Sequence, residues 1–319
     1  MKMNLIACAC AFLIAWMAVP LMKKTAWRIG AIDVPQDGRR MHTVSIPRCG
    51  GGAIFLSVVL SWIVFGEWSP FLQRVLIGAT VVFLMGLADD VLSLPPWGKL
   101  FSEVAAAMIG VGAVRSFAGV VAVVWVVMLV NAHNFIDGID GLLAGCAIVE
   151  SCALGLMLFL IGARNLILPT ILLGVSCLGF RFYNRHPAQI FAGDCGSGTI
   201  GFLFGMLSLP LFYEMRWSAG WLSPLFLFAY PIADLCAAVI RRVLQGRSPF
   251  DADKGHLHHR LCAFGLDQIS AGRILILLSA LLSFVGIWTC TGEYPMVASF
   301  TCVIAASALT GIGALFYRG

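Results

Sequence analysis

Long apolar runs constrain this chain more than any other feature of its sequence. A helix needs about 20 residues to cross a membrane, and lipid offers an exposed backbone no hydrogen-bond partner. We therefore expect an all-α, polytopic membrane protein with about 11 transmembrane helices, forming one domain over residues 1–319. Ten helices are an alternative, because several runs are short or poorly bounded. The runs span residues 4–22, 50–67, 71–87, 99–114, 117–131, 142–162, 165–181, 196–213, 221–240, 272–289 and 295–316.

The composition agrees with this class of protein. Hydrophobic residues make up 60% of the chain and charged residues 12%, whereas a soluble domain carries roughly 25% charged residues. The net charge of +5 suits anionic lipid at the inner leaflet and an anionic substrate. We therefore expect membrane lipid as a partner and no nucleic acid.

Lysine and arginine set the expected orientation. The first run has no small-residue cleavage site and is followed by Lys23, Lys24 and Arg28, which favours an uncleaved helix whose N-terminus lies outside. The inner segments then hold sixteen Lys and Arg residues and the outer ends five. All six His and ten of the eleven Asp also fall inside, Asp234 being the exception.

This one-sided distribution bears on function. A cation-coupled transporter, the main non-enzyme alternative, would more often place its polar groups near the middle of the bilayer. A membrane scaffold has no use for this density of Asp, Asn and Lys. We therefore predict an enzyme whose active site faces the cytoplasm.

Two inner segments carry paired carboxylates and amides. In "GLADDVLSLPPWGKL", the adjacent Asp89 and Asp90 predict a nearby cation, and Lys99 begins the next run. Lys99 could instead pair with Glu103 one helical turn away. In "NAHNFIDGIDG", Asn131, Asn134, Asp137 and Asp140 recur every third residue. That spacing turns each side chain about 60° from the previous one, so the four residues would line a rim rather than one stripe.

Three further segments add a carboxylate and several cations. In "IFAGDCGSG", Asp194 stands at the start of a Gly-rich helix, where a plain helix cap is the alternative. In "IPRCGGG", three glycines after Arg48 would allow close approach to a ligand or act as a hinge. In "HLHHRL", His258, His259 and Arg260 form a polar face. Zinc is the rival for these histidines, but no Cys lies at ligand spacing, so phosphate binding fits better.

Together these segments place oxygen ligands and cations on one face of the membrane. Hard oxygen ligands suit Mg²⁺, with Mn²⁺ as an alternative ion, and the cations suit the remaining oxygens of a pyrophosphate. The sequence therefore predicts phosphoryl transfer at the cytoplasmic surface of a membrane.

Four motifs then resemble those of a known family. "GLADDVLSL…K", "NAHNFIDGIDGL", "NRHPAQIFAGDCGSG" and "HLHHRL" are similar in order and spacing to those of the polyprenyl-phosphate N-acetylhexosamine-1-phosphate transferases. The resemblance implies a UDP-sugar donor, undecaprenyl phosphate as acceptor and release of UMP. It also implies ten or eleven helices in the bacterial cytoplasmic membrane, with a homodimer as an open alternative.

The resemblance also assigns roles to residues. Phe191 would stack on uracil, and Asp89 would deprotonate the lipid phosphate with Asp90 as its neighbour. The implied groups are the catalytic Asp89, Asp90 and Asp194; the metal ligands Asp194 and Asn134; the phosphate-binding Lys99, His258, His259 and Arg260; and the nucleoside-binding Asp137, Asp140, Asn184 and Phe191.

The histidine motif bears on the donor. The branch that uses UDP-MurNAc-pentapeptide typically has three consecutive His and then Phe, and "HLHHRL" departs from that pattern. The chain looks more like the branch that transfers N-acetylglucosamine 1-phosphate, for teichoic acid or another surface glycan. The pentapeptide donor is the alternative.

Overall fold

Helices make up most of the computed structural model, which describes residues 2–35, 44–112, 114–214, 219–251 and 255–291. A two-residue antiparallel pair, in which Ile32 lies opposite Pro47, is the only β-structure in those ranges. The elements are α1 (Lys2–Ile29), β1 (Ile32–Asp33), β2 (Ile46–Pro47), α2 (Gly51–Phe65), α3 (Pro70–Leu92), α4 (Pro96–Val111), α5 (Phe117–Ile136), α6 (Leu142–Leu160), η1 (Arg164–Leu166), α7 (Ile167–Asn184), α8 (Gly193–Glu214), η2 (Ala219–Leu222), α9 (Ser223–Leu227), α10 (Ala229–Leu244), α11 (Leu257–Ala263) and α12 (Gln268–Thr291).

The helices match the apolar runs better than they match the expected number of spans. Ten of the eleven runs coincide with helices, and the run over 295–316 lies outside the described residues. By length and composition, seven helices of the described part could cross a membrane, or eight if one bent pair counts as a single span. Since α2 has only 15 residues and α4 only 16, the expected number of eleven is not confirmed.

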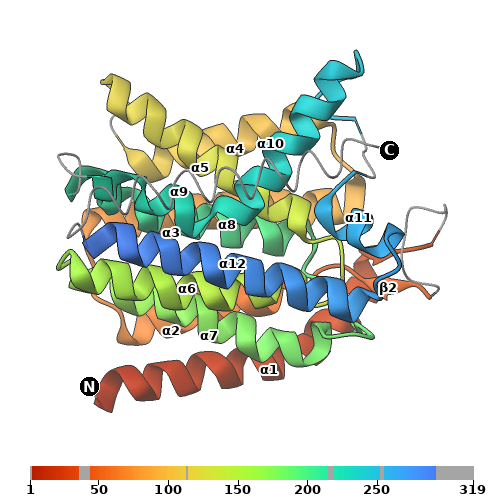
Figure 1. Cartoon of the computed structure of the whole chain (residues 1–319). Helices are drawn as coiled ribbons and strands as arrows, with labels where there is room; N and C mark the ends of the chain where they lie inside the picture. Colours follow the sequence, from red (N-terminus) through yellow and green to blue (C-terminus); the bar gives the residue numbers. More distant parts are fainter. Residues whose placement is uncertain (1, 36–43, 113, 215–218, 252–254, 292–319) are drawn as a thin grey trace.

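The bent pair corrects the prediction of one continuous helix over 221–240. A short α9 is followed by α10 at an angle of 70°. Pro231 lies in the first turn of α10, and proline has no N–H to continue the hydrogen bonding of a preceding helix. The chain therefore changes direction at Phe228, and α10 tilts away from the bundle (Figure 1).

Helix α8 forms the centre of the bundle. Its most apolar 18-residue stretch is 89% buried, compared with 22% for α1. Small residues allow neighbouring backbones to approach closely, as in many membrane helices. A Cβ atom at Gly205, for example, would lie 2.9 Å from Val126 Cα of α5. The glycines of α8 therefore let α3 and α5 pack against it and bring their inner ends to the same place.

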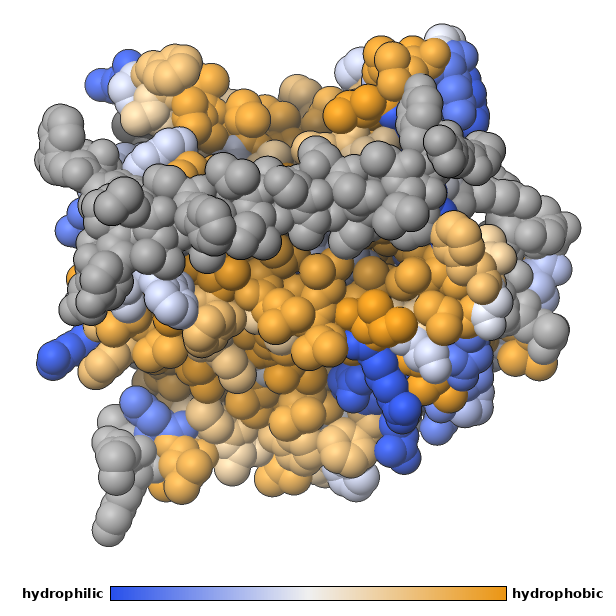
Figure 2. Space-filling model, in the orientation of Figure 1, coloured by the Kyte–Doolittle hydropathy of each residue, from blue (hydrophilic) through white to orange (hydrophobic). Residues whose placement is uncertain are grey.

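Most of the coloured surface in view is apolar, and hydrophilic side chains lie mainly toward its edges (Figure 2). Many large apolar side chains point outward, such as Leu277 and Phe284, which are 60% and 58% exposed. An apolar face of this size suits contact with lipid. The chain is a multi-pass membrane protein, and β2 and α11 lie at the end of the bundle opposite the N-terminus of α1 (Figure 1).

Candidate active site

A cavity of about 560 Å³ opens at the end of the bundle where α3, α5 and α8 meet. Side chains from α3, α4, α5, α8 and α10 line it, together with Arg48, Pro249, Phe250, Asp251, His256, His258 and His259. The cavity thus brings together residues that are more than 150 positions apart in the sequence. The predicted site residues that line it are Asp89, Lys99, Asn134, Asp137, Asp194, His258 and His259.

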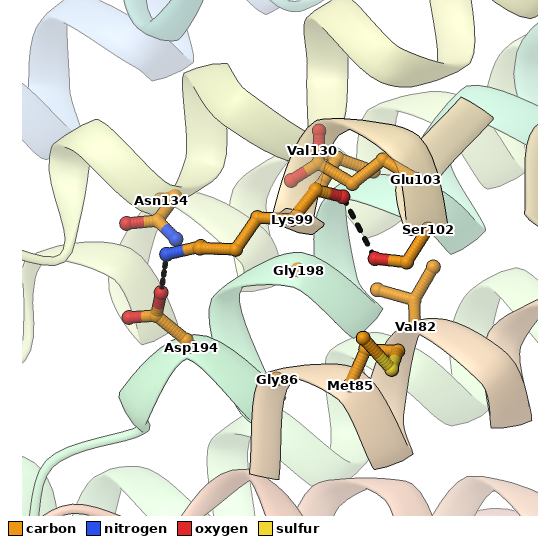
Figure 3. A pocket seen from close by; sticks show the side chains of 10 residues that line it. All are labelled: Val82, Met85, Gly86, Lys99, Ser102, Glu103, Val130, Asn134, Asp194 and Gly198. Atoms are coloured by element: carbon orange, nitrogen blue, oxygen red, sulfur yellow. Dashed lines mark hydrogen bonds and ion pairs between the residues drawn. The ribbon is translucent and has the colours of Figure 1, made fainter. Parts of the chain in front are cut away.

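Lys99 connects two of the predicted carboxylates. Its Nζ donates to Asp89 Oδ2 over 3.0 Å and also forms a hydrogen-bonded ion pair with Asp194 Oδ2. Figure 3 shows the lysine side chain extended toward Asp194, with Asn134 beside both. The predicted cation is therefore present, and it joins α3, α4 and α8. The alternative pairing of Lys99 with Glu103 is not formed, because Glu103 accepts a 2.6 Å hydrogen bond from Asn131 instead.

Asp90 is not among the residues that line the cavity, and it caps helix α8. Its Oδ1 accepts from Asp194 N over 2.9 Å, and its Oδ2 accepts from Cys195 N over 3.1 Å. The first amides of a helix have no partner within the helix and carry partial positive charge. Asp90 is buried at this helix start, so it holds in place the turn that carries Asp194.

We expect Asp90→Ala to destabilise the protein by about 1–3 kcal/mol, because two buried amides lose their acceptor. Asp90→Asn keeps one acceptor oxygen and should lose less. Thermal unfolding of both variants in detergent would measure the difference. Wild-type stability for the alanine variant would contradict the capping role.

Arg48 lines the cavity beside the predicted carboxylates, although the sequence assigned it no role. Its Nη2 lies 3.5 Å from Asp194 Oδ1, and its Nε lies 3.7 Å from Asp90 Oδ1. Gly51, three residues after Arg48, packs against the first turn of α8, and its N donates to Ala192 O over 2.8 Å. A Cβ at Gly51 would clash with Gly196. The triple-glycine run was the sequence signal for this region, because consecutive glycines indicate that another part of the molecule packs closely against the backbone.

Mg²⁺ is a reasonable fit to this group of oxygen atoms. No group of three or more His, Cys, Asp or Glu side chains is arranged as a ready metal site within the described residues. Mg²⁺ usually takes only one or two carboxylates and keeps waters and substrate phosphates as its other ligands. Asp194 and Asn134 line the same cavity, and together they offer a carboxylate and an amide oxygen of this kind.

Asp137 follows the last residue of α5 and lines the same cavity. Helix α5 continues to Ile136, five residues beyond the apolar run, so Asn131 and Asn134 lie on its last turns. Desolvation raises the pKa of Asp137 to about 7, and the charge of Asp194 adds to this against the opposing charge of Arg48. Without a bound cation, the site therefore disfavours ionised Asp137.

The raised pKa predicts a pH-dependent effect on stability. Folded Asp137 binds its proton more tightly than the unfolded carboxyl, whose pKa is near 3.8. Stability should therefore fall as the pH rises from about 4 to 7. Asp137→Asn removes the cost of ionising this carboxyl in the folded protein. The variant should therefore be more stable than the metal-free wild type by about 1–2 kcal/mol at pH 8, allowing for partial solvent access. Melting temperatures at pH 4.5 and 8 would test this, and an equal effect at both pH values would contradict it.

The histidine segment forms one wall of the cavity. The rings of His256 and His258 are parallel with centroids 5.7 Å apart, and His259 lies 4.4 Å from His258. Burial lowers the pKa of His258 to about 3, and the adjacent His259 adds to this effect. Neither ring nitrogen of His258 has a hydrogen-bond partner among the described residues. The neutral ring is thus left with polar atoms that a substrate could satisfy.

The remaining predicted residues lie outside the described lining of the cavity: Asp90, Asp140, Asn184, Phe191 and Arg260. Asp140 Oδ2 accepts from His186 Nδ1 over 2.8 Å and from Ala188 N over 3.0 Å. Asn184 Oδ1 accepts from Gly141 N over 3.1 Å. Asp140 and Asn184 thus hold the loops after α5 and α7 together, and their nucleoside role stays a prediction, as does that of Phe191.

Two further cavity residues were not assigned from the sequence. Arg242 on α10 is buried, donates to Pro249 O, and lies 5.1 Å above the ring of Phe135. Glu103 on α4 is buried and also lines the cavity. The available signal for Arg242 was its position at the end of an apolar run that also holds Asp234 and Arg241, because membrane helices rarely hold a charge without a use for it.

Comparison with known proteins identifies the family. Residues 72–211 match the model of glycosyl transferase family 4. The chain is 34% identical over 298 residues to a probable undecaprenyl-phosphate N-acetylglucosaminyl 1-phosphate transferase of Bacillus subtilis, covering 86% of this chain and 82% of that protein. It is 30% identical to a decaprenyl-phosphate N-acetylglucosaminephosphotransferase of Mycobacterium tuberculosis, covering 86% and 79%.

A third relative is the undecaprenyl-phosphate alpha-N-acetylglucosaminyl 1-phosphate transferase of Yersinia pestis. It is 29% identical, with 91% of this chain and 86% of that protein covered. The similarity extends over most of both chains, and the family match over residues 72–211 includes three of the four motifs. The chain therefore belongs to the polyprenyl-phosphate N-acetylhexosamine-1-phosphate transferases of glycosyl transferase family 4.

Proposed function

We propose that this protein transfers N-acetylglucosamine 1-phosphate from UDP-N-acetylglucosamine to undecaprenyl phosphate and releases UMP. The reaction would take place at the cytoplasmic face of the bacterial membrane and begin a lipid-linked surface glycan. The relatives named above act on N-acetylglucosamine and a polyprenyl phosphate, and this supports the same substrate classes here.

One observation carries the proposal. The Lys99 ammonium joins Asp89 and Asp194 in a polar cavity that Arg48 and Arg242 also line. Two anionic substrates can react only where their negative charges are offset. Fixed cations offset these charges most effectively in a site sheltered from water. The cavity is also large enough for a drug-sized ligand.

The rim of the cavity suits a lipid acceptor. Leu94, Leu100 and Phe250 line it, and the ring of Trp97 lies 4.8 Å from that of Phe250. Trp97 is 69% exposed, as expected for an amphipathic side chain at a membrane interface. A polyprenyl chain could remain in contact with apolar side chains while its phosphate reaches Asp89.

The residues divide the chemistry between them. A phosphate monoester has a second pKa near 6 and is mostly dianionic at neutral pH, so Asp89 need only accept or orient a residual proton. Lys99 and Arg48 would offset charge on the donor phosphates. Asp194 and Asn134 would hold Mg²⁺, which supplies neutralisation of charge between the two substrates. The acceptor oxygen attacks the β-phosphorus of the donor, and the bond from that phosphorus to the bridging oxygen breaks to leave UMP.

Purified protein with undecaprenyl phosphate, Mg²⁺ and a panel of UDP-sugars would test the proposal by release of UMP. We expect UMP with UDP-N-acetylglucosamine only when the lipid is present, and loss of the signal on chelation of the metal. Activity restricted to UDP-MurNAc-pentapeptide would contradict the choice of donor. No UMP with any donor, together with cation-driven uptake into vesicles, would instead indicate a transporter.

A further inference from the structure

Asp234 is a buried carboxylate that the proposed reaction does not use directly. It lies on α10, seven residues before Arg241, and is 1% exposed. Both of its oxygens have partners. Oδ2 accepts from His256 Nδ1 over 2.9 Å, and Oδ1 accepts from Leu257 N over 2.9 Å. A charged group within a membrane helix is costly, so such complete pairing calls for a function.

Asp234 fixes both the backbone and the ring of His256. His256 is the residue before α11, and Leu257 N is the first amide of that helix, so Oδ1 anchors its start. Because an ionised carboxylate only accepts hydrogen bonds, Nδ1 of His256 must carry a hydrogen. The second ring nitrogen, Nε2, is then the one left for other contacts. The edge-on packing of His256 against Phe135, at 5.1 Å, holds the ring further.

The orientation of His256 matters because its ring belongs to the cavity wall. His256, His258 and His259 all line the cavity; His256 stacks on His258, and His259 lies tilted against His258. A shift of the first ring would therefore move the two beyond it. Arg242 and Lys99 line the same space, so the ligand expected there is a phosphate oxygen.

We propose that Asp234 is a positioning residue: it orients His256 so that Nε2 contacts a substrate phosphate. This inference rests on the proposed function and adds a residue to it. The phosphate could belong to the nucleotide donor or to the lipid acceptor, since both present the same oxygen chemistry. The arrangement resembles the carboxylate that fixes the tautomer of a metal-ligating histidine, where loss of the carboxylate typically costs 10–100-fold in metal affinity or activity.

The test is a double-mutant cycle on UMP release. Asp234→Asn keeps the size of the side chain but lets its amide donate to Nδ1, which moves the histidine hydrogen to Nε2. We expect kcat/KM to fall about 10–100-fold, with the melting temperature close to that of wild type. Asp234→Glu restores the carboxylate and should recover part of the loss. The substrate whose KM rises identifies the phosphate that is contacted.

The decisive result is the coupling between the two residues. If Asp234 acts through His256, the Asp234→Asn change should add little to the loss already caused by His256→Gln. If the losses in kcat/KM of the two single variants multiply in the double variant, the proposal is overturned.

Glu150 offers a matched control, because it is also buried and pairs with a histidine, His133 Nε2, over 3.0 Å but does not line the cavity. Glu150→Gln should show no coupling to His256→Gln. Coupling as large as that of Asp234→Asn would mean that the cycle reports general destabilisation, and this result would also overturn the proposal.

Calorimetric binding of UDP separates this proposal from the function on which it rests. A wild-type protein that binds UDP but releases no UMP contradicts the proposed function. UDP affinity can then be measured across the same cycle. Losses of affinity that multiply in the double variant would still contradict the role of Asp234, whereas a double variant no weaker than His256→Gln would support it.

Discussion

Asp194→Asn should reduce UMP release by at least about 10³-fold while the protein stays folded. Asp194 lies in the first turn of α8 and contacts Lys99 and Arg48 with its two oxygens. The amide keeps the shape of the side chain but removes the negative charge that a divalent cation requires. The loss should therefore appear in turnover and metal dependence, and it should be measured as initial rates over a range of Mg²⁺ concentrations.

Asp267 provides a control for this change. It is exposed, lies at the start of α12, and accepts from Ser270 N over 3.0 Å. Asn caps a helix about as well as Asp, so Asp267→Asn should stay within about twofold of wild type. Near-normal turnover of Asp194→Asn would remove Asp194 from the reaction.

Lys99→Met should lower kcat/KM by about 10²–10³-fold. Met is similar in length but has no charge, so Asp89 and Asp194 would lose the cation between them. Two carboxylates that face each other without a cation disfavour a second ionised group, and an anionic donor would bind poorly. Steady-state kinetics with varied donor would measure the change in KM and in kcat separately.

Lys99→Arg and Lys23→Met complete this experiment. Arg keeps the charge but not the compact ammonium, so only part of the activity should return. Lys23 is a half-buried lysine whose Nζ donates to Gln189 Oε1 over 3.0 Å, outside the cavity lining. Equal losses for Lys23→Met and Lys99→Met would mean that net charge alone is responsible, contrary to the specific role of Lys99.

The sequence was most informative where a short-range rule applied. Adjacent carboxylates need a cation, and the structure places Lys99 3.0 Å from Asp89 and Arg48 3.7 Å from Asp90. Hydropathy likewise located ten helices, because backbone hydrogen bonding in lipid leaves few alternatives. It could not settle the number of spans, since a short apolar helix such as α2 has the same local pattern as a crossing one.

The rest of the site depends on contacts between distant parts of the chain. Whether Asp90 faces a substrate or caps α8 depends on residues more than 100 positions away. The same is true of Asp234, whose partner His256 lies 22 positions later, just before α11. Periodicity within one segment carries no information on such contacts. The roles of Arg48, Asp90 and Asp234 therefore became visible only in three dimensions.

The fate of the β-phosphorus tests the central claim most directly. UDP-N-acetylglucosamine with a radioactive β-phosphate would be incubated with the purified protein, Mg²⁺ and undecaprenyl phosphate, and the lipid and aqueous fractions would be separated. Transfer of a sugar 1-phosphate predicts that the label enters the lipid in equal amount to the UMP released. Label that stays with the nucleotide as UDP, or a lipid fraction without label, would contradict the account.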